Sequence, residues 1–332
     1  MDSYNFLYTC DKNYFPHMYT SLYSLLLHHQ DCFTTINIIE DGFSESEYSK
    51  INGLNKLFKS TKINIYPISI VSNLINYYEI PKWRGTDIAN ARLFAGEIFS
   101  GIDKLLYIDS DTLILNSLKD LFNKNYDYPV NAVRELEIPL HFKSANVRNY
   151  YNSGVLMFNL ESLRKMDYLS VISDTLKDNQ IPLLFPDQDI LNLTLRDKIG
   201  DLTPDYNLVP LICQMMNYPY LAKYKFKYNN ENYYSYDEIC NSLNKIHIVH
   251  LLGGLFGRPW DNNKINPYNK LYEEYRTIWD KDFTREENDL FLTKMLTTPL
   301  LNVLFVSLMP ADFVLSTKNE LINCFYKKGK AQ

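Results

Sequence analysis

The sequence predicts an α/β fold in which helices cover a sheet and a helical region follows at the C-terminal end. Short apolar runs alternate with longer segments of helical spacing in the order β-α-β-α-β, which favours parallel strands with covering helices. A later apolar run ends directly in two acidic residues, and the chain becomes mainly helical after Asn266. We therefore expect one large domain over residues 1–265 and a helical region over residues 266–332.

The individual elements follow from the spacing of apolar residues. Strands are expected in short apolar runs at residues 4–9, 36–39, 63–68, 104–108, 154–159 and 246–251. Helices are expected where apolar residues recur at helical spacing, at residues 19–29, 45–58, 88–99, 187–195, 270–279 and 289–304. Ser44 lies at the N-cap position of the second helix. Residues 217–236 are crowded with Tyr, Asn and Lys, and we expect an irregular layer there whose rings pack on the edge of the sheet.

Composition and charge exclude several classes of protein. Hydrophobic residues make up 46% of the 332 residues, which is enough for a sizeable core. The net charge of -5 provides no overall basic field, so no nucleic-acid partner is expected. The five cysteines are widely spaced without a CxxC pair, which predicts neither a disulfide framework nor a zinc cluster and favours the cytoplasm. The N-terminus lacks the features of a secretion signal, and no apolar run reaches the roughly 18 residues of a transmembrane helix.

Asp109 and Asp111 are the leading candidates for a functional site. They follow the apolar run Lys104–Ile108, and ligands of open α/β sheets bind beyond the carboxyl ends of the strands. Two carboxylates this close repel each other unless positive charge lies beside them, and Mn²⁺ or Mg²⁺ would satisfy both. Such an ion would bridge the phosphates of a nucleotide diphosphate and neutralise its charge as it departs. Phosphatases of the haloacid-dehalogenase type carry a similar pattern, but they usually have Thr or Val where this chain has Leu113.

Three further groups of polar residues could complete such a site. His250, near the end of a predicted strand, could be a third metal ligand, while Arg258 in the following turn could meet a diphosphate oxygen. Residues 152–154 (Asn-Ser-Gly) open another predicted strand, where the glycine allows close approach of a ligand and the asparagine offers a donor and an acceptor. Residues 187–189 (Asp-Gln-Asp) start a predicted helix. Each group also has a plain structural explanation, as a structural strand histidine, a turn and an acidic helix cap.

In this order, the four groups resemble the retaining glycosyltransferases of family GT8, and in particular bacterial galactosyltransferases that build lipooligosaccharide. The resemblance spans roughly residues 4–260. It implies a GT-A fold, which is a Rossmann-like mixed sheet flanked by helices. It also implies that Asp109, Asp111 and His250 are the metal ligands, with Mn²⁺ or Mg²⁺ as the ion.

The resemblance implies roles for further residues. Asp11 and Asn13 would contact the uracil base, and Arg92 would meet the ribose and diphosphate. Asp187 and Gln188 match the pair beside the transferred sugar, where the catalytic groups are expected. The implied nucleotide-sugar-binding residues are Thr9, Asp11, Asn13, Thr86, Arg92, Asp109, Ser110, Asn152, Ser153, Gly253 and Arg258.

The chain departs from the family pattern in two places. The family's H-x-x-G-x-x-K-P-W is two residues longer here, and Arg258 replaces its Lys. Ser153 replaces a common Ala, which could change the hydroxyl contacts near the sugar. The family's acidic residue on the acceptor side falls near Glu135.

The reaction implied by the resemblance is transfer of a hexose from UDP-galactose or UDP-glucose to a hydroxyl of a saccharide acceptor, with retention, in cell-surface glycan synthesis. Because Gln188 is an amide and a poor nucleophile, we expect front-face substitution rather than double displacement. The rings of residues 217–236 would alternatively form an acceptor surface. The apolar run at residues 299–315 and the lysines after it either pack on the protein or contact the inner face of the cell membrane. The rival expectation is a non-catalytic nucleotide-sugar-binding module.

Overall fold

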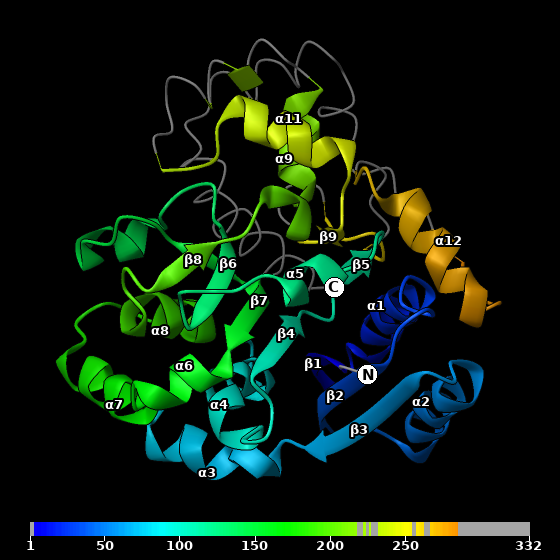
Figure 1. The fold of residues 1–332 in the computed structure, drawn as a ribbon, viewed down its shortest axis with the longest axis horizontal. Coiled ribbons are helices and arrows are strands. Elements are labelled where there is room, and N and C mark those ends of the chain that lie inside the picture. Colours follow the sequence, from blue (N-terminus) through cyan, green and yellow to red (C-terminus); the bar gives the residue numbers. More distant parts are fainter. Residues whose placement is uncertain are drawn as a thin grey trace, which may run out of the picture.

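The protein folds around a seven-stranded mixed sheet with helices on both faces (Figure 1). The computed structural model describes residues 3–217, 222, 223, 226, 232–253, 257–261 and 266–284. From edge to edge the strands are β3 (Thr61–Pro67), β2 (Thr34–Asp41), β1 (Tyr4–Asp11), β4 (Lys104–Ile108), β7 (Tyr151–Asn159), β6 (Val130–Arg134) and β8 (Ile199–Asp201).

One strand of this sheet, β7, runs opposite to all the others. The strands from β3 to β4 are parallel, whereas β7 is antiparallel to both β4 and β6. A separate antiparallel pair is formed by β5 (Thr112–Ile114) and β9 (Ile248–His250). The carboxyl end of β4 therefore lies where the parallel half meets an antiparallel strand, and the short pair continues from it.

Helices connect and cover these strands. Along the chain they are α1 (Phe15–Leu27), α2 (Glu45–Leu57), α3 (Ser69–Tyr77), the 3₁₀ helix η1 (Ile88–Phe94), α4 (Ala95–Ile98), α5 (Lys119–Asn123), η2 (Leu140–Ala145), α6 (Leu160–Lys165), α7 (Tyr168–Asp178), α8 (Pro186–Thr194), η3 (Pro204–Tyr206), α9 (Pro210–Met216), α11 (Tyr236–Asn244) and α12 (Asn269–Trp279). Helix α12 packs along α1, where the Trp279 indole N–H donates to the Thr20 hydroxyl at 3.1 Å.

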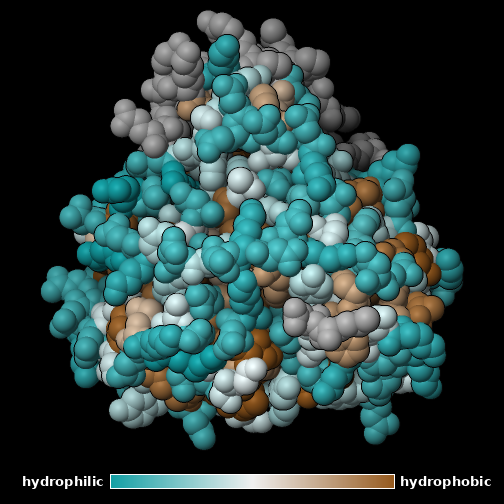
Figure 2. Space-filling model, viewed as in Figure 1, coloured by the Kyte–Doolittle hydropathy of each residue, from teal (hydrophilic) through white to brown (hydrophobic). Residues whose placement is uncertain are grey.

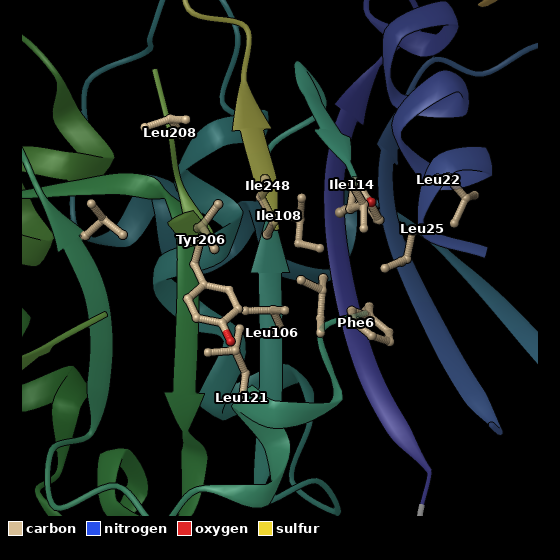
Figure 3. Close-up of a cluster of buried hydrophobic side chains, with 14 of the residues drawn as sticks. Phe6, Leu22, Leu25, Leu106, Ile108, Ile114, Leu121, Tyr206, Leu208 and Ile248 are labelled. Atoms are coloured by element: carbon tan, nitrogen blue, oxygen red, sulfur yellow. The ribbon is translucent and has the colours of Figure 1, made fainter. Parts of the chain in front are cut away.

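Alternate residues of the central strands enter two separate cores. Phe6 of β1 belongs to the core beneath α1, and its neighbour Leu7 belongs to the core on the opposite face. Figure 3 shows Leu22 and Leu25 of α1 beside Phe6 in the first core. Because strand side chains alternate between the two faces, burial on both sides requires the continuous apolar runs that the sequence shows.

Polar side chains are prominent on one face of the molecule. Figure 2 shows hydrophilic residues over most of the face drawn, with hydrophobic residues in scattered groups. Within the described residues, no helix has both the length and the apolar character needed to cross a membrane. The four cysteines that fall in the described ranges are free thiols.

Most of the predicted elements are confirmed with shifted ends. All six predicted strands are present, as β1, β2, β3, β4, β7 and β9. The predicted Ser44 cap is part of a capping box, in which Ser44 and Glu47 each accept from the other's backbone N–H. Helix α12 confirms the helix predicted at residues 270–279.

One further prediction is wrong, and others concern residues that lie outside the described part of the chain. The helix predicted at residues 88–99 is instead η1 followed by the short α4, and every residue of η1 is buried. Because protein surrounds η1 on all sides, its apolar residues need not lie along one face of an α-helix, as their spacing had suggested. Of residues 217–236, Tyr233 and Tyr234 are buried in the core, as a packing layer requires, and most of the others lie outside the described residues. The helix predicted at residues 289–304 lies outside them as well.

His29 fastens the end of α1 to the turn that follows β5. Its ring Nδ1–H donates to the Leu25 carbonyl at 2.7 Å, and Nε2 accepts the Leu118 N–H at 2.9 Å. Burial lowers its pKa from 6.5 to about 4, because the charged ring would be desolvated and would lose the bond from Leu118.

This lowered pKa predicts a pH-dependent stability. Between about pH 6.5 and 4 the unfolded chain binds a proton at His29 that the folded chain does not, so the free energy of unfolding falls as the pH falls, by up to about 1.4 kcal/mol per pH unit. Urea unfolding of His29→Gln should therefore show a difference between pH 6.5 and pH 4.5 that is smaller than in the wild type by about 2 kcal/mol. An unchanged difference would contradict the buried neutral histidine.

Candidate active site

Two carboxylates and one histidine meet at the carboxyl end of β4. Asp109 and Asp111 follow directly after the last residue of β4, and Asp111 immediately precedes β5. The register of β5 and β9 pairs Thr112 with His250, which places the histidine beside Asp111. The Leu251 N–H donates to the Asp111 carbonyl at 2.7 Å and fixes this approach. One ligand atom of each of the three residues lies within 4.8 Å of the other two.

Some polar atoms of these three side chains already bond to neighbouring side chains. Oδ1 of Asp109 accepts from the Tyr107 hydroxyl at 2.5 Å and pairs with Arg92 at 2.8 Å. Oδ2 of Asp111 pairs with the Arg258 guanidinium at 3.2 Å. The atoms left facing one another are Asp109 Oδ2, Asp111 Oδ1 and His250 Nε2, with Nε2 at 3.6 and 3.1 Å from the two oxygens.

The electrostatics of the group indicate a strong demand for positive charge. Burial by itself would raise the pKa of Asp111, but His250 and Arg258 hold it well below its usual range. Burial likewise would lower the pKa of His250, and the neighbouring Asp111 raises it instead. The ionised Asp111 thus draws a proton onto the histidine, and a divalent cation could take the place of that proton.

The donor set fits a divalent cation. Two carboxylate oxygens and one imidazole nitrogen suit Mn²⁺, and Mg²⁺ also binds carboxylates with open positions left for phosphate oxygens. Gly154 of β7 makes room for the group: a Cβ on it would lie 2.2 Å from His250 Cε1 and 2.8 Å from Asp109 Oδ2. The Gly154 carbonyl also accepts the Asp109 N–H at 2.7 Å, so the strand backbone passes directly against the ligands.

Arg92 connects this group to the start of α8. Its guanidinium is 5% exposed, lies 4.2 Å over the Tyr107 ring, and pairs with Asp187 at 3.3 Å as well as with Asp109. It also donates to the Ser153 carbonyl at 2.7 Å. Burial raises the pKa of Asp187, with Arg92 opposing that rise. One buried cation thus holds two carboxylates from different elements in place.

The second predicted pair member, Gln188, faces the same strand. Its Oε1 accepts the Ser153 N–H at 2.9 Å, and its Nε2 donates to Glu135 at 3.4 Å. Glu135 also accepts from Asn152 Nδ2 at 2.7 Å, and the Ser153 hydroxyl donates to Asp187 at 2.8 Å. The structure therefore brings both predicted segments together, with Glu135 beside them.

The other predicted residues make mainly local contacts near β1, η1 and Arg258. The Ser110 hydroxyl donates to the Thr9 carbonyl at 2.9 Å. Asp11 Oδ1 accepts the backbone N–H of Asn13 at 2.8 Å and shapes the turn before α1. Thr86 Oγ1 accepts the Ile88 N–H at 3.2 Å at the start of η1. Gly253 packs near Arg258, where a Cβ on the glycine would lie 3.5 Å from Arg258 Cγ.

The altered loop that carries Arg258 is fastened by aromatic rings. Trp260 stacks on His17 of α1 with ring centroids 3.7 Å apart, and His17 Nδ1 lies 2.6 Å from the Tyr272 hydroxyl of α12. Burial lowers the pKa of His17 to about 3, so this ring is neutral at physiological pH. The described part of the lengthened loop thus still brings Arg258 to Asp111.

Two residues of the site carry no signal that sequence reasoning detected. Tyr107 lies within an apolar strand run, where a tyrosine is unremarked, yet its hydroxyl supports Asp109. Asn207 follows η3 and accepts from His250 Nδ1 at 2.9 Å. Both act on a ligand from positions that only the fold brings close to it.

A mixed Rossmann-like sheet whose fourth strand ends in an Asp-x-Asp pair facing a histidine is the arrangement of a GT-A glycosyltransferase. The chain belongs to glycosyl transferase family 8, whose family model matches residues 5–264. The resemblance noted in the sequence is thereby confirmed.

Similar proteins agree with this assignment. The chain is 26% identical over 283 residues to general stress protein A of Bacillus subtilis, covering 81% of this chain and 92% of that protein. It is 27% identical over 259 residues to a lipopolysaccharide 1,2-glucosyltransferase of Escherichia coli, covering 70% and 68%. The fold is similar to that of the galactosyltransferase LgtC in complex with donor and acceptor sugar analogs, with a TM-score of 0.66 and 19% identity over 82% of this chain and 95% of that one.

The tight approach of Gly154 predicts a large effect of a small substitution. Gly154→Ala should lower the free energy of unfolding by about 1–3 kcal/mol, because the added methyl overlaps His250 and Asp109 in a closely packed sheet. Gly101→Ala is the control, since a Cβ there meets nothing within 4 Å, and it should stay within about 0.5 kcal/mol of the wild type. Equal urea midpoints for the two variants would refute the crowding at Gly154.

Proposed function

We propose that this protein is a metal-dependent retaining hexosyltransferase that moves galactose or glucose from a UDP-sugar to a hydroxyl of a saccharide acceptor. The observation that carries the proposal is the convergence of Asp109 Oδ2, Asp111 Oδ1 and His250 Nε2 on one point, next to the buried Arg92–Asp187 pair. Membership of family 8 supports the class of reaction.

Asp109, Asp111 and His250 would hold Mn²⁺ or Mg²⁺. A bound divalent ion neutralises the negative charge that develops on a departing diphosphate. Arg258 is placed to act with it, because it is 19% exposed, pairs with Asp111 and lies over the Tyr14 ring at 5.6 Å. A guanidinium held in this way can meet a phosphate oxygen with two N–H groups.

The donor would lie across the carboxyl ends of β1 and β4. Asp11 at the end of β1 and Asn13 in the turn after it would contact the base, with Thr9 and Thr86 lining the same approach. The Arg92 guanidinium is fully engaged by protein groups, so its role would be to fix Asp109 and Asp187 rather than to reach far into the ligand.

The transferred sugar would lie between β7 and the start of α8. Asp187 would accept from its hydroxyls, with Asn152, Ser153 and Glu135 nearby. Gln188 is held by the Ser153 N–H and by Glu135, so its amide is oriented before the substrate binds. Because an amide is a poor nucleophile, we favour substitution on the front face, through a short-lived ion pair of the sugar cation and UDP.

In this mechanism the protein mainly orients the substrates and stabilises the charges that develop on them. The bond between the anomeric carbon and the diphosphate oxygen breaks first, and Arg258 stabilises the departing oxygen. The acceptor hydroxyl attacks from the same face and passes its proton to that oxygen. Attack on that face keeps the anomeric configuration α, and Gln188 would stabilise the positive charge on the sugar through its amide oxygen.

The acceptor is proposed to be a glycoconjugate of the cell surface. Several similar proteins are described as lipopolysaccharide glycosyltransferases, including the 1,3-galactosyltransferase of Salmonella typhimurium, which is 24% identical over 218 residues. Such an acceptor would place the protein in the cytoplasm, at the inner face of the membrane. The apolar and lysine-rich segment proposed to contact that surface lies outside the described residues.

Loss of either metal-binding carboxylate should lower activity far more than stability. Asp109→Asn and Asp111→Asn should each lower kcat/KM for UDP-hexose hydrolysis or transfer by about 100-fold or more, because several kcal/mol of charge stabilisation are lost. Asp103→Asn is the matched control, since Asp103 precedes the opposite end of β4 and is exposed, and it should keep full activity. Unchanged turnover in the Asp109 or Asp111 variant would contradict the assignment of these residues as metal ligands.

The same assay tests the class of function. Mn²⁺-dependent release of UDP from UDP-galactose or UDP-glucose is expected of a transferase, whereas a binding module would show ligand-induced thermal stabilisation without turnover. Release of phosphate from phosphomonoesters, with no reaction of UDP-sugars, would indicate a phosphatase instead.

Gln188→Ala separates the two possible retaining mechanisms. Front-face substitution predicts that transfer falls by roughly 10–100-fold but persists, because the amide only stabilises charge. Measuring UDP-sugar and Mn²⁺ affinity alongside the rate checks that the site is intact. Complete loss of transfer with both affinities preserved would call for a covalent intermediate.

A further inference from the structure

A line of four buried or half-buried polar side chains runs from the sugar side of the site to the metal side. Asn152 donates to Glu135 at 2.7 Å, Asn207 donates to Asn152 at 2.8 Å, and Asn207 accepts from His250 at 2.9 Å. The last three are 7%, 4% and 1% exposed, so water does not substitute for these partners. Three different parts of the fold supply them: β7, the turn after η3, and β9.

The orientation of the Asn152 amide determines the direction of this chain of hydrogen bonds. The Gly154 N–H donates to Asn152 Oδ1 at 2.8 Å, and a backbone N–H can only donate. The oxygen of the Asn152 amide must therefore face Gly154, and its NH₂ must face the Glu135 carboxylate, which accepts. Asn207 must then present its NH₂ to Asn152 Oδ1 and its oxygen to His250.

That direction determines where the histidine carries its proton. Asn207 Oδ1 accepts, so His250 Nδ1 must donate, and in the neutral ring the lone pair is then on Nε2. Reversing one amide would set two oxygens or two NH₂ groups against each other at the next link. The opposite tautomer would leave Asn207 Oδ1 unpaired and point an N–H at the two carboxylates.

We infer that Asn207 is a positioning residue that holds the proton of His250 on Nδ1 and so presents Nε2 as a metal ligand. The inference rests on the proposed function in that it requires the metal, and it adds the residue that prepares the ligand. Groups that hydrogen-bond a ligating histidine in this way typically change metal affinity by about 10–100-fold when they are removed. A simple structural role for Asn207 would predict lower stability without a specific effect on the metal.

Three variants of the full-length protein test this role, with Mn²⁺ binding measured by the electron paramagnetic resonance of free Mn²⁺ in saturating UDP. Asn207→Leu should bind Mn²⁺ about 10–100-fold more weakly than the wild type. Asn207→Asp keeps an acceptor for Nδ1–H but turns its second oxygen toward Asn152 Oδ1, so it should recover part of the affinity and bind Mn²⁺ more tightly than Asn207→Leu. Asn37→Leu is the control, because Asn37 is also buried and bonded on β2, to the Phe6 carbonyl and to Asn64, and it should bind as the wild type does.

The outcomes separate this inference from the proposed function. Equal affinity of the wild type and Asn207→Leu, or equal weakness of Asn207→Leu and Asn207→Asp, overturns the role of Asn207 and leaves the metal site standing. A wild type that binds no Mn²⁺ with UDP overturns both.

Spectra of the wild type provide a second test that does not depend on how the Asn207 variants fold. Nitrogen-15 spectra of histidine-labelled protein with Mg²⁺ and UDP should show the His250 proton on Nδ1, with the signal assigned by its loss in His250→Gln. A proton found on Nε2 would overturn the inference.

Discussion

The buried guanidinium of Arg92 is the interaction on which the site depends. It lies between Asp109 at the end of β4 and Asp187 at the start of α8, and it rests on the Tyr107 ring. Desolvation of such a cation is costly, and the two nearby carboxylates, with the Ser153 carbonyl, offset that cost. The charge that joins the two halves of the site is therefore also what keeps each carboxylate in its place.

Close approach of backbone and ligands is the second constraint. β7 runs antiparallel beside β4, so its Gly154 carbonyl receives the Asp109 N–H and its missing side chain leaves space for His250. The same strand carries Asn152 and Ser153 toward Glu135 and Asp187. Strand β7 thus contacts the proposed metal ligands through Gly154 and the proposed sugar side through Asn152 and Ser153. A shift of this strand would therefore move both parts of the site.

The sequence predicted the strand cores well because burial on both faces demands continuous apolar runs, as in β1 and β4. It missed β5 and β8, where three residues are too few to show a pattern, and it also missed the five-residue strand β6. Segment 88–99 was misread as one helix, since a fully buried segment can carry apolar residues at helical spacing without being an α-helix. Within the site, the acidic pair and His250 were detectable by their position after strands, whereas Tyr107 was indistinguishable from a core aromatic.

By itself, the sequence determined which chemical groups are available and the strand ends at which they occur. The Asp109–Asp111 pair after an apolar run already implied a demand for positive charge, because close carboxylates repel whatever the fold. Only the tertiary structure decided which side chains complete the site around these carboxylates, since the register of β5 and β9 places His250 beside Asp111. It alone also joined Asn207 to His250, because hydrogen bonds between residues 43 positions apart leave no periodic trace in a sequence.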